Sequence, residues 1–209
     1  MKRHYKLAPL LLIIMISLSA CYEKDSSPLP YLGMPEIVDG DTIKHKIPPF
    51  SLITQDSLTI TNQDLSDNIY IADFFFMSCP TICPRVMQQM QRLYKHYENN
   101  EKIRFISHTL DPKRDTPERL KMYADNLEID TKKWHFLTGD KDHIYDLAET
   151  YFVVAYEDSE APGGVNHSGK ILLVDTQGHI RGFAEGTDPE DVDGFFADID
   201  KLLAEYEAK

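Results

Sequence analysis

The 209-residue sequence predicts an α/β protein in which helices cover both faces of a central mixed sheet. The run "NIYIADFFF", residues 68–76, is β-branched and aromatic throughout, which is typical of a strand buried on both faces. Such strands alternate with amphipathic segments, and parallel strands need crossover connections of this kind. Near the C-terminus a hairpin pattern precedes a last helix, which adds antiparallel strands to the sheet.

The elements follow in order from residue 50. Alternating apolar residues predict a hairpin over residues 50–60, and the buried strand at 68–76 comes next. Pro84 then marks the start of a helix, and "KIRFISHTL", residues 102–110, reads as the following strand. The helix carries one apolar stripe made of Val86, Met87, Met90, Leu93, Tyr94 and Tyr97.

The second half of the chain repeats this alternation. Thr116 as N-cap and Pro117 as first residue predict a second helix, and residues 134–139 form a short strand. Asp140 caps a further helix that ends near Tyr151. Residues 169–186 form a hairpin that turns at "DTQG", and Asp188–Pro189 opens the last helix. A β-α-β unit joined to a β-β-α unit predicts a thioredoxin-like three-layer sandwich with a central mixed sheet.

The first residues differ from the rest. "MKRHYK" is basic and the next 14 residues are uncharged, which indicates a signal peptide over residues 1–20. The "LSAC" that ends at Cys21 resembles a bacterial lipoprotein signal, in which the cysteine carries the lipid; an uncleaved signal-anchor is the alternative. The sequence therefore predicts a lipid-anchored protein on the extracytoplasmic, periplasmic side of a membrane. It also predicts a tether over residues 21–48 and one domain over 49–209.

The net charge of −12 disfavours a nucleic-acid partner, because binding to phosphates requires a basic face. An acidic surface suits a cationic partner, although it also serves solubility alone.

Two cysteines remain once Cys21 is assigned to lipid, and they are Cys79 and Cys83. Pro84 cannot stand inside a helix, so we expect the regular helix to begin at Pro84 with Cys83 as its cap. Both sulfurs then lie near the positive end of the helix, which lowers the pKa of a thiol.

Three chemistries are open to this pair. A disulfide requires β-carbons about 3.8 Å apart, and a flexible turn could supply that distance. A metal ion tolerates a wider separation, so the three-residue spacer favours metal binding. The third interpretation is a pair of inert core cysteines. A metal site needs another donor, and two histidines suit it: His108 at the end of a predicted strand, and His167 in the glycine-rich loop "PGGVNHSG".

Three stretches together resemble the Sco/SenC family of copper-binding, thioredoxin-fold proteins: "FFFMSCPTICP", "DPKRDTP" at Asp111–Pro117, and "VNHSGKILLVDTQG" at Val165–Gly178. The resemblance implies copper, as Cu(I) or Cu(II), bound by Cys79, Cys83 and His167. It also implies delivery to the copper-bearing subunit of cytochrome c oxidase or to another copper or thiol protein, or maturation of the cysteines of the binuclear copper centre. Two thiolates and one imidazole form a soft ligand set that suits copper.

The chain departs from the family at Met77 and Ser78, where Met77 is either an extra soft contact or a core residue. Asp115 and Thr116 read as the cap of the next helix, and Asp111–Pro112 reads as the turn that leads to it. Asp111 is also a candidate to orient a metal ligand.

Three rival functions use the same residues. A thiol–disulfide reductase would use Cys79 and Cys83 as a redox pair. A peroxiredoxin is disfavoured, because Phe76 stands where those enzymes have the peroxide-orienting threonine. A structural zinc site is disfavoured because three ligands leave one position open.

Overall fold

The computed structural model describes residues 27–207. The predicted signal peptide at 1–20 and Cys21 lie outside the described residues, and so do residues 22–26 of the predicted tether. Among residues 27–207, no helix has both the length and the apolar character that crossing a membrane requires.

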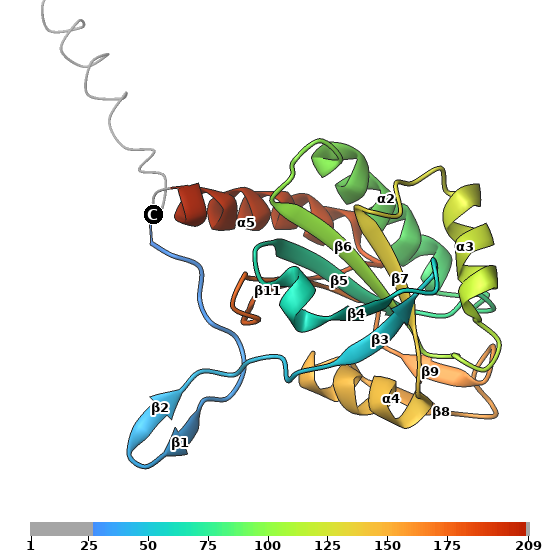
Figure 1. The fold of residues 1–209 in the computed structure, drawn as a ribbon, viewed down its shortest axis with the longest axis horizontal. Coiled ribbons are helices and arrows are strands. Elements are labelled where there is room, and N and C mark those ends of the chain that lie inside the picture. Colours follow the sequence, from blue (N-terminus) through green and yellow to red (C-terminus); the bar gives the residue numbers. More distant parts are fainter. Residues whose placement is uncertain (1–26, 208–209) are drawn as a thin grey trace, which may run out of the picture.

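A seven-stranded mixed sheet forms the centre of the molecule, in the order β11-β10-β5-β6-β7-β3-β4 (Figure 1). β5, β6 and β7 are parallel, while β10, β11, β3 and β4 pair antiparallel with their neighbours. The strand bounds are Ser51–Thr54 (β3), Thr59–Thr61 (β4), Ile69–Phe75 (β5), Ile103–Thr109 (β6), Trp134–Thr138 (β7), Lys170–Val174 (β10) and Ile180–Glu185 (β11). The predicted mixed sheet is thus confirmed.

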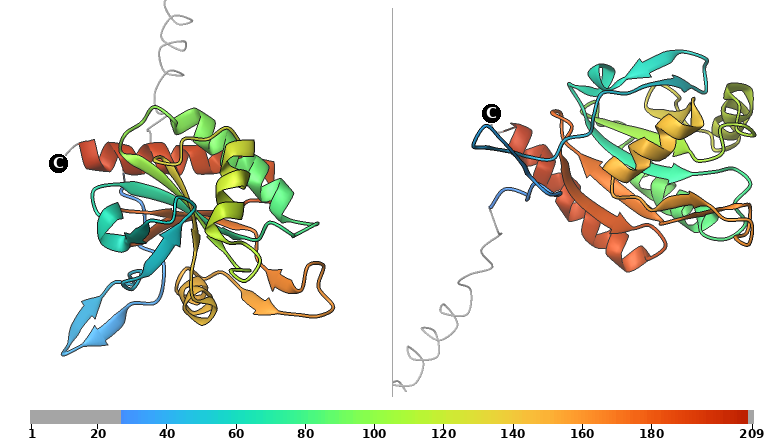
Figure 2. Two further views of the ribbon diagram at one scale, coloured as in Figure 1. Left: turned by 45° about the vertical axis from the view of Figure 1, so that its right-hand side comes forward. Right: turned by 90° about the horizontal axis from the view of Figure 1, so that it is seen from below.

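Helices lie on both faces of this sheet. α2, α3 and α5 cover one face and α4 covers the other (Figures 1 and 2). Their bounds are Cys83–Tyr97 (α2), Pro117–Asn126 (α3), Lys141–Thr150 (α4) and Pro189–Glu207 (α5). The predicted caps are confirmed at two helices, because the side chains of Thr116 and Asp140 accept hydrogen bonds from the backbone N–H groups of Arg119 and His143. This is the predicted three-layer sandwich.

The core lies between the sheet and the helices. β5 is buried at all seven positions, as expected for a strand covered on both faces. The predicted stripe of α2 is buried at Val86, Met87, Met90, Leu93 and Tyr97. Burial of large side chains such as these is the main stabilising contribution to a domain of this size.

The structure contains short elements that the sequence did not predict. β1 (Glu36–Val38) and β2 (Asp41–Ile43) form a hairpin whose six residues are all exposed, and a 3₁₀ turn, η1, spans Asn62–Leu65. β8 (Ala155–Glu157) pairs with β9 (Val165–His167) in a second separate hairpin. Strands of three residues are too short to show a period of two in the sequence.

The segment before the first hairpin is fastened to the body of the domain. Arg181 is buried on β11, and its guanidinium donates to the carbonyl oxygens of Leu29 and Pro30 at 2.6 and 3.1 Å. The same guanidinium pairs with Asp175 at 3.3 Å and with Glu205 of α5 at 2.8 Å. Residues 29 and 30 are therefore held beside the end of α5.

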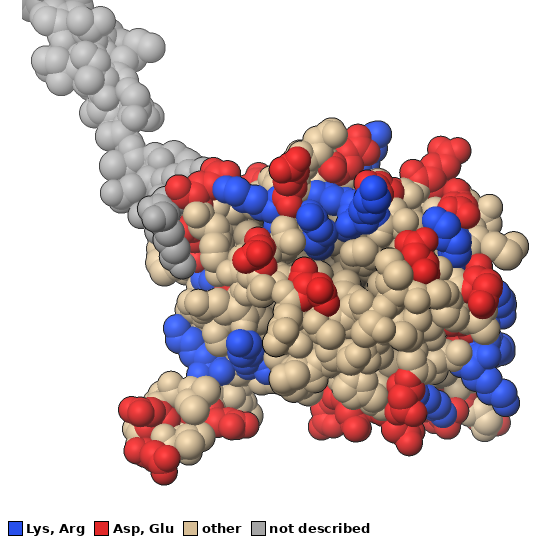
Figure 3. Space-filling view, in the orientation of Figure 1, with Lys and Arg blue, Asp and Glu red and all other residues tan. Residues whose placement is uncertain are grey.

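Acidic side chains gather over two parts of the face shown in Figure 3. One is the tip of the β1–β2 hairpin, where Asp39 and Asp41 stand, and the other is the region of α4. Along the opposite, upper edge of this face, basic and acidic side chains are interspersed.

Candidate metal centre

Cys79 lies on the turn that follows the carboxyl end of β5, and Cys83 is the first residue of α2. The N–H of Cys79 donates to the carbonyl oxygen of Phe76 at 3.1 Å, which closes the turn. α2 begins at Cys83, with Ile82 as N-cap and Pro84 as the second residue. The prediction that Cys83 caps the helix was therefore wrong by one residue, because proline is tolerated anywhere in the first turn, where its missing N–H has no partner to lose.

His167 reaches the same place from the β8–β9 hairpin. It is the last residue of β9, opposite Ala155 of β8, so it stands on a strand and not in the loop that the sequence suggested. The glycines that suggested a loop form the turn of this hairpin, where Gly163 and Gly164 have φ angles of 89° and 88°. The hairpin lies beside the start of α2, at the end of the molecule away from the C-terminus (Figures 1 and 2).

The three side chains meet in a tight group. The Sγ atom of Cys83 lies 3.3 Å from Nε2 of His167. The two sulfurs and a ring nitrogen of His167 all lie within 4.8 Å of one another, and all three residues are buried. Over residues 27–207 this is the one cluster of three or more His, Cys, Asp or Glu with the spacing of a metal site. Both cysteines are free thiols.

Hydrogen bonds define the proton positions on His167. Nδ1 lies 3.1 Å from the carbonyl oxygen of Ser168, and a carbonyl only accepts, so Nδ1 carries the proton. Nε2 therefore presents its lone pair to Cys83. Burial lowers the pKa of His167, although the Ser168 carbonyl acts in the opposite direction, so the ring is neutral at pH 7. A neutral imidazole whose other nitrogen is held by a carbonyl is the form that binds metals.

The two thiols differ in acidity. Burial raises the pKa of Cys83, and the neighbouring Cys79 raises it further, so Cys83 donates its S–H to His167 when no metal is bound. Burial also raises the pKa of Cys79, but hydrogen bonds from the backbone N–H groups of Cys83 and Thr81 outweigh it and lower the pKa overall. The prediction that the helix end lowers both thiol pKa values holds for Cys79 and fails for Cys83, where burial dominates.

A pocket of about 220 Å³ opens onto the cluster. Cys79 and His167 line it, together with Asp158 and Glu160 from the turn of the hairpin. Two carboxylates at its edge favour the approach of a cation.

The other predicted candidates lie apart from this group. His108 is fully buried in the core, where its ring stacks on Phe74 at a centroid distance of 4.6 Å and faces Tyr151 at 5.6 Å. Met77 packs against the core with part of its surface exposed. Asp111 pairs with Arg114 of the same turn. The sequence suggested that Asp115 helps to cap α3, and this prediction was wrong. Its carboxylate instead accepts a hydrogen bond from the N–H of Met77 at 3.1 Å.

Asp73 is a buried acid that none of the sequence motifs includes. It is fully buried on β5, accepts a hydrogen bond from Ser107 at 2.5 Å, and leaves its second oxygen without a partner among residues 27–207. Burial raises the pKa of Asp73 to about 7, although the Ser107 hydroxyl lowers it in part. The signal was in the sequence, since this is one acidic residue inside the apolar run 68–76.

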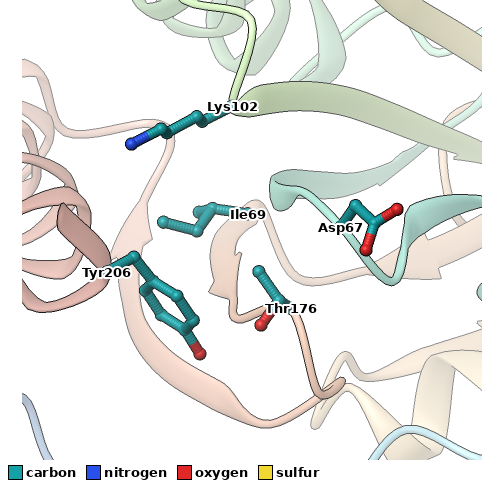
Figure 4. Close-up of a pocket in the computed structure, with 5 residues that line it drawn as sticks. All are labelled: Asp67, Ile69, Lys102, Thr176 and Tyr206. Carbon is teal, nitrogen blue, oxygen red and sulfur yellow. The ribbon is translucent and has the colours of Figure 1, made fainter. Parts of the chain in front are cut away.

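A second pocket, of about 170 Å³, lies at the opposite end of the sheet (Figure 4). Asp67, Ile69 and Lys102 line it at the amino ends of β5 and β6, with Thr176 and Tyr206 across from them. Lys102 pairs with Glu207 at 3.5 Å. No cysteine or histidine lines this pocket, so its chemistry differs from that of the Cys79–Cys83–His167 cluster.

Comparison with known proteins gives a consistent family. The SCO1/SenC family model matches residues 39–204. A SCO1 protein homolog of Bacillus subtilis is 29% identical over 161 residues, which cover 76% of this chain and 83% of that protein. A putative copper-binding protein of Stutzerimonas stutzeri is 32% identical over 162 residues, covering 75% and 76% of the two chains.

Solved structures agree with this result. BsSco, described as a Sco-family cytochrome c oxidase assembly protein with a disulfide switch, superposes with a TM-score of 0.66 at 29% identity and covers 76% of this chain and 93% of its own. Copper-bound ScoI of Arabidopsis thaliana superposes with a TM-score of 0.63 at 27% sequence identity. The match covers 76% of this chain and 98% of that one. A SCO1/SenC family lipoprotein of Bacillus anthracis shares the fold, with a TM-score of 0.70 at 24% identity over 82% of this chain and 99% of that one.

The family match spans most of the chain and includes the turn, the helix and the hairpin that bring two thiols and an imidazole together. This protein belongs to the SCO1/SenC family.

Proposed function

We propose that the protein carries copper outside the cytoplasm, binds it through Cys79, Cys83 and His167, and delivers it to the binuclear copper centre of cytochrome c oxidase. The convergence of the three ligand atoms within 4.8 Å carries this proposal. Two thiolates and an imidazole suit Cu(I) and also accept Cu(II). The copper-bound Arabidopsis relative and the oxidase-assembly role stated for BsSco support the choice of metal and recipient.

The residues of the site have different roles in binding copper. Cys79, with its lowered pKa, is the thiol that ionises first and meets the incoming ion. Cys83 must release its proton, and the lone pair on Nε2 of His167 is already directed at this sulfur. Asp158 and Glu160 at the pocket edge attract the cation.

We propose further that Cys21 holds the protein at a membrane through lipid. The basic n-region, the uncharged stretch and "LSAC" support this proposal, and the related Bacillus anthracis protein is described as a lipoprotein. Globomycin treatment of producing cells tests it: blocked processing with accumulation of the longer precursor is expected, and unchanged processing would contradict it.

Copper titration with absorption spectroscopy tests the ligand set. Cys79→Ser and Cys83→Ser should lose tight binding, because each removes a thiolate donor. His167→Ala should retain the sulfur-to-copper absorption but bind copper more weakly, by at least the roughly 10–100-fold that loss of a hydrogen-bond partner of a ligand costs. His143→Ala on α4 is the matched control, and its affinity should equal that of the unmodified protein. Equal copper affinity of the unmodified protein and His167→Ala in chelator competition would overturn the assignment of His167.

A second candidate function is thiol–disulfide exchange with a partner. The free Cys79–Cys83 pair and the disulfide switch described for BsSco favour it. In that reaction the Cys79 thiolate attacks a partner disulfide and Cys83 releases the partner as two thiols, which leaves a Cys79–Cys83 disulfide. His167→Ala separates the two functions, since it should impair copper binding and leave the first attack, by the Cys79 thiolate, intact. Only the resolving step, in which Cys83 loses the proton that it shares with His167, should become slower.

A further inference from the structure

The turn at residues 111–115 contacts both segments that carry the metal-site residues. Asp115 belongs to this turn and is fully buried. Its Oδ2 accepts hydrogen bonds from the N–H of Met77 at 3.1 Å and from the hydroxyl of Thr109 at 2.6 Å. Met77 stands two residues before Cys79, so the turn supports the cysteine side of the site.

Arg114, the preceding residue, supports the histidine side. Its Nη2 donates to the carbonyl oxygen of Gly163 at 3.0 Å, at the tip of the β8–β9 hairpin. The carboxylate of Asp111 pairs with Nε of the same guanidinium and aligns it. Adjacent residues of one turn thus hold the two segments from which Cys79 and His167 come.

Gly163 fits closely under this contact. Its φ of 89° favours glycine, and a Cβ there would lie 2.6 Å from Cε2 of Phe76. The Phe76 ring in turn meets the His167 ring at a centroid distance of 5.5 Å. Arg114 therefore holds Gly163, Gly163 packs against Phe76, and Phe76 contacts the imidazole of His167.

The hairpin depends on such outside contacts. β8 and β9 pair with each other and not with the seven-stranded sheet. A two-stranded hairpin is marginally stable by itself. Besides the contact with Arg114, the hairpin is linked to the body by an ion pair between Lys141 and Glu157 and by the contact of His167 with Cys83. Apolar contacts add to these, because Val165 packs into the core and the Phe76 ring meets His167.

We propose that Arg114 is a positioning residue that fastens the tip of the β8–β9 hairpin and so keeps His167 next to the two sulfurs. The inference rests on the proposed function for its copper readout. With the contact intact, the imidazole stays over the cysteines and bound copper leaves slowly. When it breaks, the hairpin moves away more often, and the ion is held by the two thiolates alone for part of the time.

The first test uses the metal-free protein. Hydrogen exchange measured by mass spectrometry on Arg114→Gln should show about three- to tenfold faster exchange over residues 155–167, the effect of one solvent-exposed hydrogen bond. Exchange in β5 and β10 should not change. Arg92→Gln is the matched control, because Arg92 pairs with Asp193 at 2.5 Å between α2 and α5 and has no contact with the hairpin. Equal exchange over 155–167 in Arg114→Gln and the unmodified protein would overturn the inference.

The second test measures loss of copper to a chelator in excess. Copper should leave Arg114→Gln about three- to tenfold faster than the unmodified protein, with the sulfur-to-copper absorption retained. In a His167→Ala background the same substitution should have no further effect, because Arg114 acts through the imidazole. Full acceleration in that background would contradict the proposed role. If the unmodified protein does not bind copper, the proposed function fails, and the exchange experiment still decides on Arg114.

Discussion

Residue by residue, burial decides the acid–base character of this site. Cys83, His167 and Asp73 all lie inside the protein, and for each the largest influence on the pKa is burial, which favours the neutral form. Cys79 differs because backbone N–H groups reach its sulfur. The site therefore combines one thiol prepared to ionise with a second that keeps its proton until a metal or a disulfide takes its place.

Asp73 makes stability depend on pH. In the folded protein its carboxyl is neutral up to about pH 7, whereas in the unfolded chain it ionises above its ordinary pKa of 3.8. The unfolded state therefore binds fewer protons between these values, and the free energy of unfolding falls as the pH rises from about 4 to about 7. Relative to Asp73→Asn, the unmodified protein should lose about 2–3 kcal/mol between pH 5 and pH 8.

Urea unfolding at several pH values measures this difference. Burial lowers the pKa of His108 to about 4, so His108 changes stability in the opposite direction, but it does so in both proteins and cancels in the comparison. Parallel pH profiles for Asp73→Asn and the unmodified protein would show that the carboxyl is ionised when folded.

At the scale of elements, strand and helix order could be predicted from the sequence, while the short hairpins could not. The seven-residue strand β5 and the fifteen-residue helix α2 are long enough to show their periods. β8 and β9 have three residues each, and their glycine-rich turn suggested a loop. The residues alone suggested two candidate histidines, His108 and His167, and the family motifs selected His167 as the partner of the two cysteines. The roles of Arg114 and Asp115 could not be predicted, because they depend on contacts between distant segments that no local pattern reveals.

The β1–β2 hairpin should be dispensable for folding. Its six residues are exposed, including Ile37 at 78%. Replacing residues 35–42 with Gly-Gly should change the melting temperature by less than about 3 °C, because almost no apolar surface leaves the core. Differential scanning calorimetry checks this outcome, and a drop of about 10 °C would show that the hairpin supports the domain.

For the molecule as a whole, Arg181 joins distant parts of the chain. It is 3% exposed and binds Asp175 and Glu205 together with the carbonyl oxygens of residues 29 and 30. A buried ionic group of this kind is costly to break, because removing one partner leaves the others uncompensated.

Arg181→Met should therefore reduce the free energy of unfolding by about 3–5 kcal/mol. Arg92→Met removes the exposed Arg92–Asp193 pair and should cost at most about 1 kcal/mol. Chemical denaturation of both variants makes the comparison. Equal losses would mean that the buried group contributes no more than a surface pair.

The Arg181 cluster also limits how far the domain would lie from a lipid on Cys21, the anchor proposed above. Arg181 binds the carbonyl oxygens of Leu29 and Pro30, so eight residues, Cys21 to Pro28, separate the proposed anchor from this fixed point. Eight residues at about 3.6 Å each span at most roughly 29 Å. The first described residues lie beside the end of α5, and the β8–β9 hairpin, which carries His167, lies at the far end of the domain (Figures 1 and 2). A chain acylated at Cys21 would thus stay within a few nanometres of the bilayer, with its metal site on the side away from the anchor. It could then reach only acceptor proteins whose binding surface lies at a similar distance from the membrane.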